Sequence, residues 1–185
     1  MPWDKDRFVE LERRVKETLK GARPALDVPY FRFLYGLGDG IERTCIIEFQ
    51  NMVKRLKADE LSAETIFLSE LLLDSLRGFG LLDEDVLKIE SIDRKEIYND
   101  LRSRNFKEEI VNRLIDRLDG KGTSHCAVLL RAGALFPFVN ISHIISGLDG
   151  KVDCVLVIPY PGSKEGEMLW YRDNDSNNYY RWETV

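Results

Sequence analysis

Apolar residues near the N-terminus recur at intervals of three and four, which predicts an amphipathic helix within residues 1–22. Asp4 is placed to cap the first turn of this helix, and Gly21 and Pro24 would end it. The predicted buried stripe consists of Phe8, Leu11, Val15 and Leu19.

An aromatic run from Tyr30 to Tyr35 predicts a strand, which the glycine-rich turn GLGDG follows. Asp39 and Glu42 have the spacing of a capping box at the start of a helix. A short apolar run, Thr65–Leu68, predicts the next strand. The order of strand, turn, helix and strand is typical of a βαβ unit. Its helix would bury Cys45, Phe49, Met52, Val53 and Leu56.

A leucine-rich segment predicts a brief helix that ends at Gly78 or Gly80. Residues 83–120 are highly charged yet keep a helical period, which predicts helices over about 93–102 and 106–118. Asn105 and Glu108 form a second capping-box pair. The charges have mixed signs, so we interpret the region as a solvated helical segment inserted between strands.

The stretches Cys126–Leu130 and Cys154–Ile158 are almost continuously apolar, which predicts central strands buried on both faces. Between them, Phe136-Pro137 leads into a short helix that Asn140 or Ser142 would cap. Two aromatic-rich segments, 167–173 and 177–185, then predict a terminal hairpin or two added strands.

Strands that alternate with helices favour a single α/β domain over residues 1–185. We expect three layers, with a mostly parallel sheet of about five to six strands and helices on both of its faces. The C-terminus would add an antiparallel hairpin or edge. A length of 185 residues is enough for one domain with a proper core.

The composition, 44% hydrophobic and 32% charged, is that of an ordinary soluble protein. A net charge of -5 excludes a global field that attracts nucleic acid or anionic membrane. It does not exclude a local basic groove. Three cysteines lie in apolar patterns, as free thiols in a reducing cytoplasm do. Neither a secretory signal nor a membrane span of about 20 residues is apparent, so we expect a cytoplasmic protein.

Ligands of parallel sheets bind at the carboxyl ends of the strands. The loop GLGDG lacks the Lys and Ser or Thr of a Walker loop, so we interpret it as a turn. Arg131 follows a buried strand directly, where a cation needs a partner or water, and His143 lies beyond Phe136 and Pro137. Arg131 and His143 together would bind an anion. A nucleotide- or nucleic-acid-binding module is therefore an alternative function.

No motif supplies a catalytic centre. His125 has no Cys or His at ligand spacing, and the sequence holds no CxxC, HExxH or GxSxG motif. The predicted strand ends carry Tyr35, Arg131 and Tyr160 where a metal-dependent hydrolase needs carboxylates. We therefore predict no catalytic residue, no metal and no cofactor.

Aromatic residues are dense near the C-terminus, and Tyr and Trp are typical hot-spot residues of protein interfaces. The same residues would stack nucleic-acid bases, for which only Arg172 and Arg181 supply interleaved charge, or would pack on the core. These aromatics are Trp170, Tyr171, Tyr179, Tyr180 and Trp182.

Three C-terminal motifs, GALFPFVNISHIISGL, VLVIPYPG and NNYYRW, resemble the BrxB family of bacteriophage-exclusion (BREX) defence systems. Asn140 stands where that family has an arginine, so an anion site built from the arginine does not carry over. Ser142 replaces a histidine, with His143 displaced by one position, and Ser146-Gly147 replaces a double asparagine. The matching elements fall at Gly133–Phe138, Ile144–Leu148, Pro161-Gly162 and Asn178–Arg181.

The resemblance implies a cytoplasmic phage-defence component whose partners are other BREX proteins: a PglZ-like phosphatase-fold protein, a large ATPase or a DNA methyltransferase. It attaches no catalytic activity to residues. Our leading hypothesis is a non-enzymatic adaptor that docks on these proteins, and the alternative is the nucleotide- or nucleic-acid-binding module. The predicted binding residues are Arg131, Phe136, Pro137, His143, Trp170, Tyr179, Tyr180 and Arg181.

Overall fold

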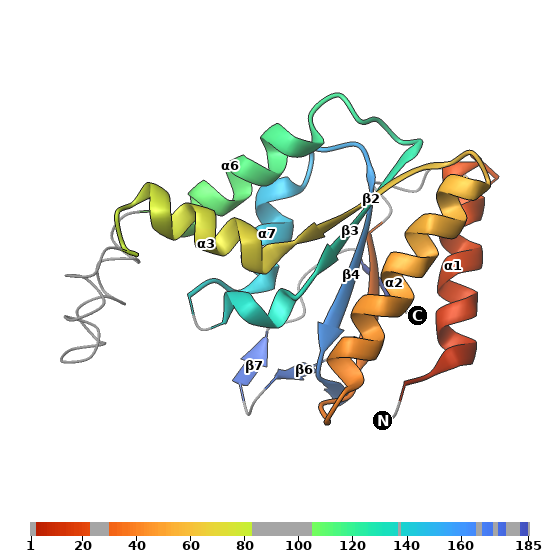
Figure 1. Cartoon of the computed structure of the whole chain (residues 1–185), viewed down its shortest axis with the longest axis horizontal. Coiled ribbons are helices and arrows are strands. Elements are labelled where there is room, and N and C mark those ends of the chain that lie inside the picture. The colour runs from red at the N-terminus through yellow and green to blue at the C-terminus, as the bar shows by residue number, and fades with distance from the viewer. Residues whose placement is uncertain are drawn as a thin grey trace.

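The computed structural model describes residues 3–22, 30–82, 105–136, 138–165, 168–171, 174–176 and 182–184, with side chains up to residue 162. The helix predicted over about 93–102 lies outside these residues. Helices cover both faces of a central sheet (Figure 1). Their bounds are α1 (Lys5–Leu19), α2 (Ile41–Ala58), α3 (Leu68–Gly78), α6 (Phe106–Leu118), the 3₁₀ helix η1 (Ala132–Leu135) and α7 (Ile141–Leu148).

The main sheet is parallel throughout the described residues, with the strand order β2-β3-β4-β1-β8. β1 lies between β4 and β8, so that Phe31 is opposite both Val157 and Glu183. β2 is the outermost strand on the other side, and its Ser62 is opposite His125. These pairings confirm the predicted α/β class. The strands are β1 (Tyr30–Tyr35), β2 (Ser62–Phe67), β3 (His125–Leu130), β4 (Val155–Pro161) and β8 (Trp182–Thr184).

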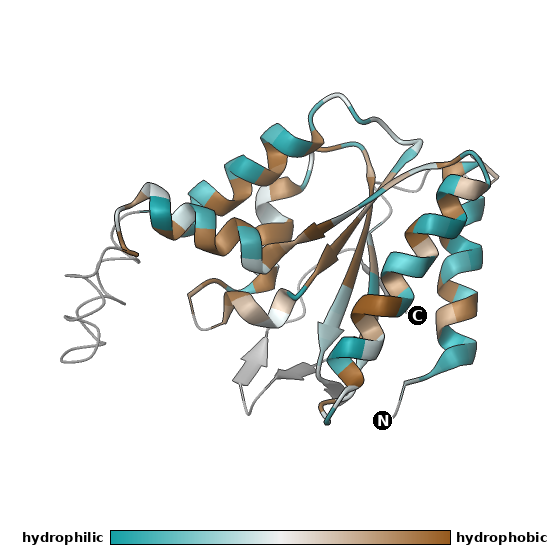
Figure 2. Ribbon diagram, viewed as in Figure 1, coloured by the Kyte–Doolittle hydropathy of each residue, from teal (hydrophilic) through white to brown (hydrophobic). Residues whose placement is uncertain are grey.

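The sheet separates two hydrophobic cores, because successive side chains of a strand point to opposite faces. On one face, Phe31 and Phe33 of β1 pack with the buried stripes of α1 and α2. On the other face, Leu129 and Ile158 pack with α3, α6 and α7. Figure 2 shows that these helices turn their hydrophobic sides toward the sheet. The stripes predicted for α1 and α2 are buried, and β3 and β4 are buried along their whole length, as predicted.

The helix starts confirm two of the predicted caps and contradict two. Asp4 Oδ1 accepts a hydrogen bond from the Arg7 amide at 3.1 Å. Asn140 Oδ1 likewise accepts from the Ser142 amide at 3.0 Å, so Asn140 is the cap of α7.

The two capping-box predictions, Asp39 with Glu42 and Asn105 with Glu108, are wrong. The residue that precedes α2 is Gly40, in a left-handed conformation that an L-residue adopts with strain. Asn105 is also left-handed, with φ 54°, and its side chain makes no capping hydrogen bond. A capping box needs an extended backbone at the cap, which neither position has.

The C-terminal segment differs from the predicted hairpin. Residues 177–185 contribute β8, which pairs parallel to β1, whereas β6 (Met168–Tyr171) pairs antiparallel with β5 (Ser163–Glu165) and β7 (Asn174–Ser176). The hairpin between 167–173 and 177–185 is therefore not confirmed. The total of five to six strands remains a prediction, because parts of this segment lie outside the described residues.

Candidate functional site

The carboxyl ends of β1 and β4 lie close together at one edge of the sheet. The Gly162 amide, just after β4, donates a 2.9 Å hydrogen bond to the Tyr35 carbonyl at the end of β1. β6 and β7 lie beyond the arrowhead of β4 in Figure 1, so the small antiparallel sheet is near this end of the main sheet. A ligand site at the end of β1 and β4 would therefore include the β4–β5 turn.

Arg131 occupies an unusual position at the end of β3. Its backbone is left-handed, with φ 60° and ψ 44°, and its side chain is exposed. Its carbonyl accepts a hydrogen bond from the Ala134 amide, which begins η1. A non-glycine residue in this conformation carries strain of order 1 kcal/mol, and such strain is often found at functional sites.

The other predicted residues do not converge on Arg131 within the described part of the chain. His143 is exposed on α7, and no described hydrogen bond or ion pair joins it to Arg131. Phe136 is 40% exposed beyond η1, while Pro137 lies outside the described residues.

The side chains of the C-terminal aromatic residues lie outside the described residues. The backbone of Trp170 lies in β6, opposite Ser163 and Asp175, but its side chain is outside the described residues. Tyr179, Tyr180 and Arg181 lie outside them entirely. Their predicted role in binding stays a prediction.

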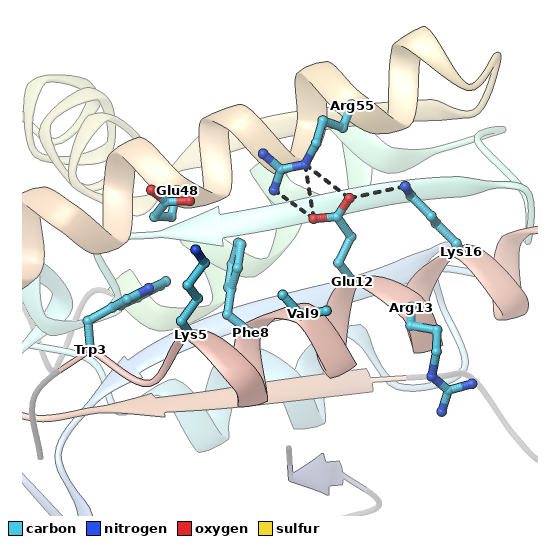
Figure 3. Close-up of a pocket in the computed structure, with 9 residues that line it drawn as sticks. All are labelled: Trp3, Lys5, Phe8, Val9, Glu12, Arg13, Lys16, Glu48 and Arg55. Atoms are coloured by element: carbon cyan, nitrogen blue, oxygen red, sulfur yellow. Dashed lines mark hydrogen bonds and ion pairs between the residues drawn. The ribbon is translucent and has the colours of Figure 1, made fainter.

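A groove of about 620 Å³ runs between α1 and α2 on the outer side of the domain (Figure 3). Trp3 and Phe8 form its apolar part. Both rings pack against Phe33, with ring centroids 5.2 Å (Trp3) and 5.9 Å (Phe8) from that of Phe33. Val9 is 57% exposed, so an apolar side chain already faces water in the groove. The sequence patterns missed the groove because its lining comes from two helices separated by a strand.

Charged residues along the groove are paired mainly with one another. Glu12 accepts hydrogen bonds from Arg55 at 2.6–3.1 Å and forms an ion pair with Lys16 at 3.1 Å. Burial raises the pKa of Glu12, but the bonds from Arg55 and Lys16 outweigh burial and hold the pKa below its usual value. Lys5 and Glu48 lie at the Trp3 end of the groove (Figure 3).

The groove is suited to binding rather than to bond cleavage. Its floor is apolar, and its central carboxylate is held ionised by two cations instead of being poised near neutral pH. An apolar floor between charged walls is the surface that an amphipathic helix recognises.

The thiols are unsuited to nucleophilic or metal chemistry. All three cysteines are buried, and burial raises the pKa of each, that of Cys154 to about 11. They are therefore protonated at neutral pH, whereas a metal ligand or nucleophile must be a thiolate. In the part of the chain that the structure describes, no three His, Cys, Asp or Glu side chains gather as a metal site. None of the described helices has the length and apolar character needed to cross a bilayer.

Sequence patterns also missed two buried polar residues. Arg32 of β1 is 5% exposed, and burial lowers the pKa of its guanidinium. His125 is 4% exposed and contacts Ser62 and Glu64 of the neighbouring strand. A charged residue within an aromatic strand was the available signal for Arg32. The burial of His125 depends on the pairing of β2 with β3, which local sequence patterns do not predict.

The fold is that of a three-layer α/β protein, with a groove between α1 and α2. The family described as BREX protein BrxB matches residues 64–185, about two thirds of the chain. The chain therefore belongs to the BrxB family of BREX phage-defence systems, as its C-terminal motifs indicated. The matched span runs from β2 to β8, so α1, β1 and α2 precede it. No curated protein matches the chain.

Proposed function

We propose that this protein is a cytoplasmic adaptor of a BREX system that docks on another BREX protein, in the first place a PglZ-like one. Membership of the BrxB family supports a role in a BREX system. The groove between α1 and α2 carries the proposal, because it offers an apolar floor whose Val9 side chain is exposed to water.

The occupant that fits this groove is an amphipathic helix of the partner. Its apolar residues would cover Val9 and the accessible edge of Trp3, which removes apolar surface from water. The walls hold cations and carboxylates that largely neutralise each other, so a helix with polar flanks of both signs meets no net repulsion.

Co-purification tests the proposal. The tagged protein is expressed with its PglZ-like partner and recovered under matched conditions. Val9→Asp should reduce recovery of the partner at least tenfold, because it places a charge in the apolar contact. Leu73→Asp on α3 is the matched control, since Leu73 is also an exposed apolar helix residue, 43% exposed, away from the groove.

The same assay separates the groove from the aromatic tail. Trp170→Ala combined with Tyr180→Ala should weaken the complex if the C-terminal aromatics form the contact. Full recovery of the partner with both this double variant and Val9→Asp would refute docking through either surface. Thermal unfolding of each purified variant shows whether a loss of binding is due to a loss of folding.

A second candidate function is favoured by the strained, exposed Arg131 at the carboxyl end of β3. We infer that a nucleotide or nucleic-acid phosphate is the matching ligand, because guanidinium groups bind phosphate oxygens in a bidentate manner. A nucleotide at about 100 times its Kd should stabilise the protein by about 2.7 kcal/mol, and Arg131→Ala should abolish that shift. Absence of any shift, together with absence of salt-sensitive DNA binding, removes this candidate.

A further inference from the structure

The first residues of β2 and β3 bring a serine, a histidine and a glutamate into contact. Ser62 is opposite His125 in the parallel register, and Glu64 lies two residues further along β2 on the same face. Ser62 Oγ is 2.7 Å from His125 Nδ1, and Glu64 Oε1 is 3.2 Å from His125 Nε2. One ring nitrogen thus contacts a hydroxyl and the other a carboxylate, which is the connectivity of a nucleophilic triad.

The contacts define the protonation of the imidazole. An ionised carboxylate only accepts hydrogen bonds, so Nε2 carries the hydrogen and Nδ1 accepts from the Ser62 hydroxyl. Burial lowers the pKa of His125, and the charges of Lys121 and Lys57 add to this effect, while Glu64 opposes it. The neutral imidazole is the state that a general base needs at neutral pH.

Exposure differs among the three residues as a nucleophilic site requires. Ser62 is exposed, whereas the imidazole behind it is 4% exposed. Arg117 contacts the other carboxylate oxygen of Glu64, Oε2, at 3.1 Å, and Lys121 lies 3.8 Å from Oε1. Small molecules can therefore reach the hydroxyl while its base remains fixed and shielded.

We propose that Ser62, His125 and Glu64 form a nucleophilic site that hydrolyses an ester bearing a negative charge. Ser62 Oγ attacks the ester carbonyl carbon and gives its proton to His125 Nδ1. The C–O bond to the alcohol breaks, and the departing oxygen takes that proton. Water then attacks the acyl-serine and gives a proton to His125, which returns it to Ser62 Oγ as the acid leaves.

The surroundings of Ser62 suggest how charge is handled at this site. Arg117 and Lys121 both pair with the one carboxylate of Glu64, and Lys57 adds a further positive charge near the imidazole, so the surroundings favour an anionic substrate. β2 is the outermost strand of the described sheet, so every second backbone N–H along it points away from β3. Such N–H groups are the donors that stabilise the negative carbonyl oxygen in acyl transfer. Ser62 and His125 are the catalytic residues, and Glu64 positions the imidazole.

Labelling of the full chain with a biotinylated fluorophosphonate tests the nucleophile. We expect one adduct, mapped to Ser62 by peptide mass spectrometry, which is lost in Ser62→Ala and retained in Ser146→Ala, a variant of another exposed serine. His125→Asn should slow the labelling about 100-fold or more, because general bases contribute that much. Absence of an adduct on Ser62, or equal labelling rates with and without His125, overturns the proposal.

Ester hydrolysis tests the substrate class and the role of Glu64. The probes are 4-acetoxybenzoate and its methyl ester, which differ by one charge and one methyl group, and each enzymatic rate is compared with the uncatalysed rate of the same probe. We expect a higher kcat/KM for the anion, and Lys57→Ala should narrow the difference between the two probes. Glu64→Gln should lower kcat, and Glu64→Asp should restore part of it. Equal rates in wild type and Ser62→Ala overturn the proposal, and this outcome is independent of docking in the groove between α1 and α2.

Discussion

Gly147 of α7 lies directly against Val111 of α6. A Cβ atom added at Gly147 would come within 2.7 Å of both methyl carbons of Val111. Real Cβ atoms do not approach carbon atoms so closely, so the glycine sets the distance between the two helices. These helices cover one face of the sheet, and their contact keeps Leu114 and Ile144 buried.

Gly147→Ala should therefore lower the free energy of unfolding by about 1–3 kcal/mol, the usual cost of overpacking. In a Val111→Ala background both 2.7 Å contacts are absent and only the 3.3 Å contact with Cβ of residue 111 remains. The same change should then become close to neutral or stabilising, because alanine favours helices over glycine by about 1 kcal/mol. Urea unfolding of the four proteins in this cycle provides the measurement. Ser146→Ala, at an exposed position, is the control; a Gly147→Ala effect of the same size in both backgrounds would contradict the proposed contact.

Glu12→Gln should destabilise the protein by about 0.5–1 kcal/mol at neutral pH, because Arg55 and Lys16 are partly exposed and water screens their attraction. The pKa of Glu12 is lowered in the folded state, so its stabilising effect is complete above its usual value of 4.5. The effect is lost as the pH falls through the folded-state pKa. The difference between wild type and Glu12→Gln should therefore shrink in acid.

Urea unfolding across this pH range checks the prediction for Glu12. Asp74→Asn is the control, because Asp74 and Arg77 form an ion pair in which both side chains are more than half exposed. That variant should differ little from wild type at any pH. A loss for Glu12→Gln that does not depend on pH would show that packing, rather than the ion pair, is responsible.

His125 should make the protein less stable in mild acid. Its pKa is lowered in the folded state, so the unfolded chain binds more protons below the usual value of 6.5. The free energy of unfolding should fall as the pH drops from 6.5 toward the lowered pKa. His125→Asn should remove this component. Unfolding of both proteins between about pH 7.5 and 5.5 measures it, and parallel curves would contradict the prediction.

The three thiols should be almost unreactive in the folded protein. Their burial and raised pKa leave little thiolate at neutral pH, so an aromatic disulfide reagent should react with them far more slowly than with a free cysteine. All three should react at once in denaturant. Lys151→Cys, which adds a thiol at an exposed position, should react rapidly and serves as the control. Rapid reaction of any native cysteine would contradict this prediction.

Local patterns were sufficient to predict much of the fold. The stripe Phe8, Leu11, Val15 and Leu19 is buried because a helix repeats every 3.6 residues wherever it packs. β1 spans the predicted Tyr30–Tyr35 for a similar reason, since aromatic side chains suit a strand covered on both faces. The places of Asp4, and of Asn140 or Ser142, just before apolar runs predict caps, and the structure uses Asp4 and Asn140.

Features that depend on the three-dimensional arrangement were not predictable. Asn105 has a left-handed backbone and therefore does not form the predicted capping box. No neighbouring residue in the sequence requires that conformation. Ser62 and His125 are far apart in the sequence and meet only through the register of β2 and β3. The groove needs α1 and α2 to lie side by side, which the sheet order imposes.

The position of β1 has a consequence for how the chain is made. The residues of β1 are synthesised before those of its described neighbours, β4 and β8, at residues 155–161 and 182–184. Its backbone hydrogen bonds to these strands therefore form only after residues 155–161 and 182–184 have left the ribosome. Contacts of such long sequence separation slow folding. The aromatic strand YFRFLY is thus exposed to chaperones and to aggregation until the last strand arrives.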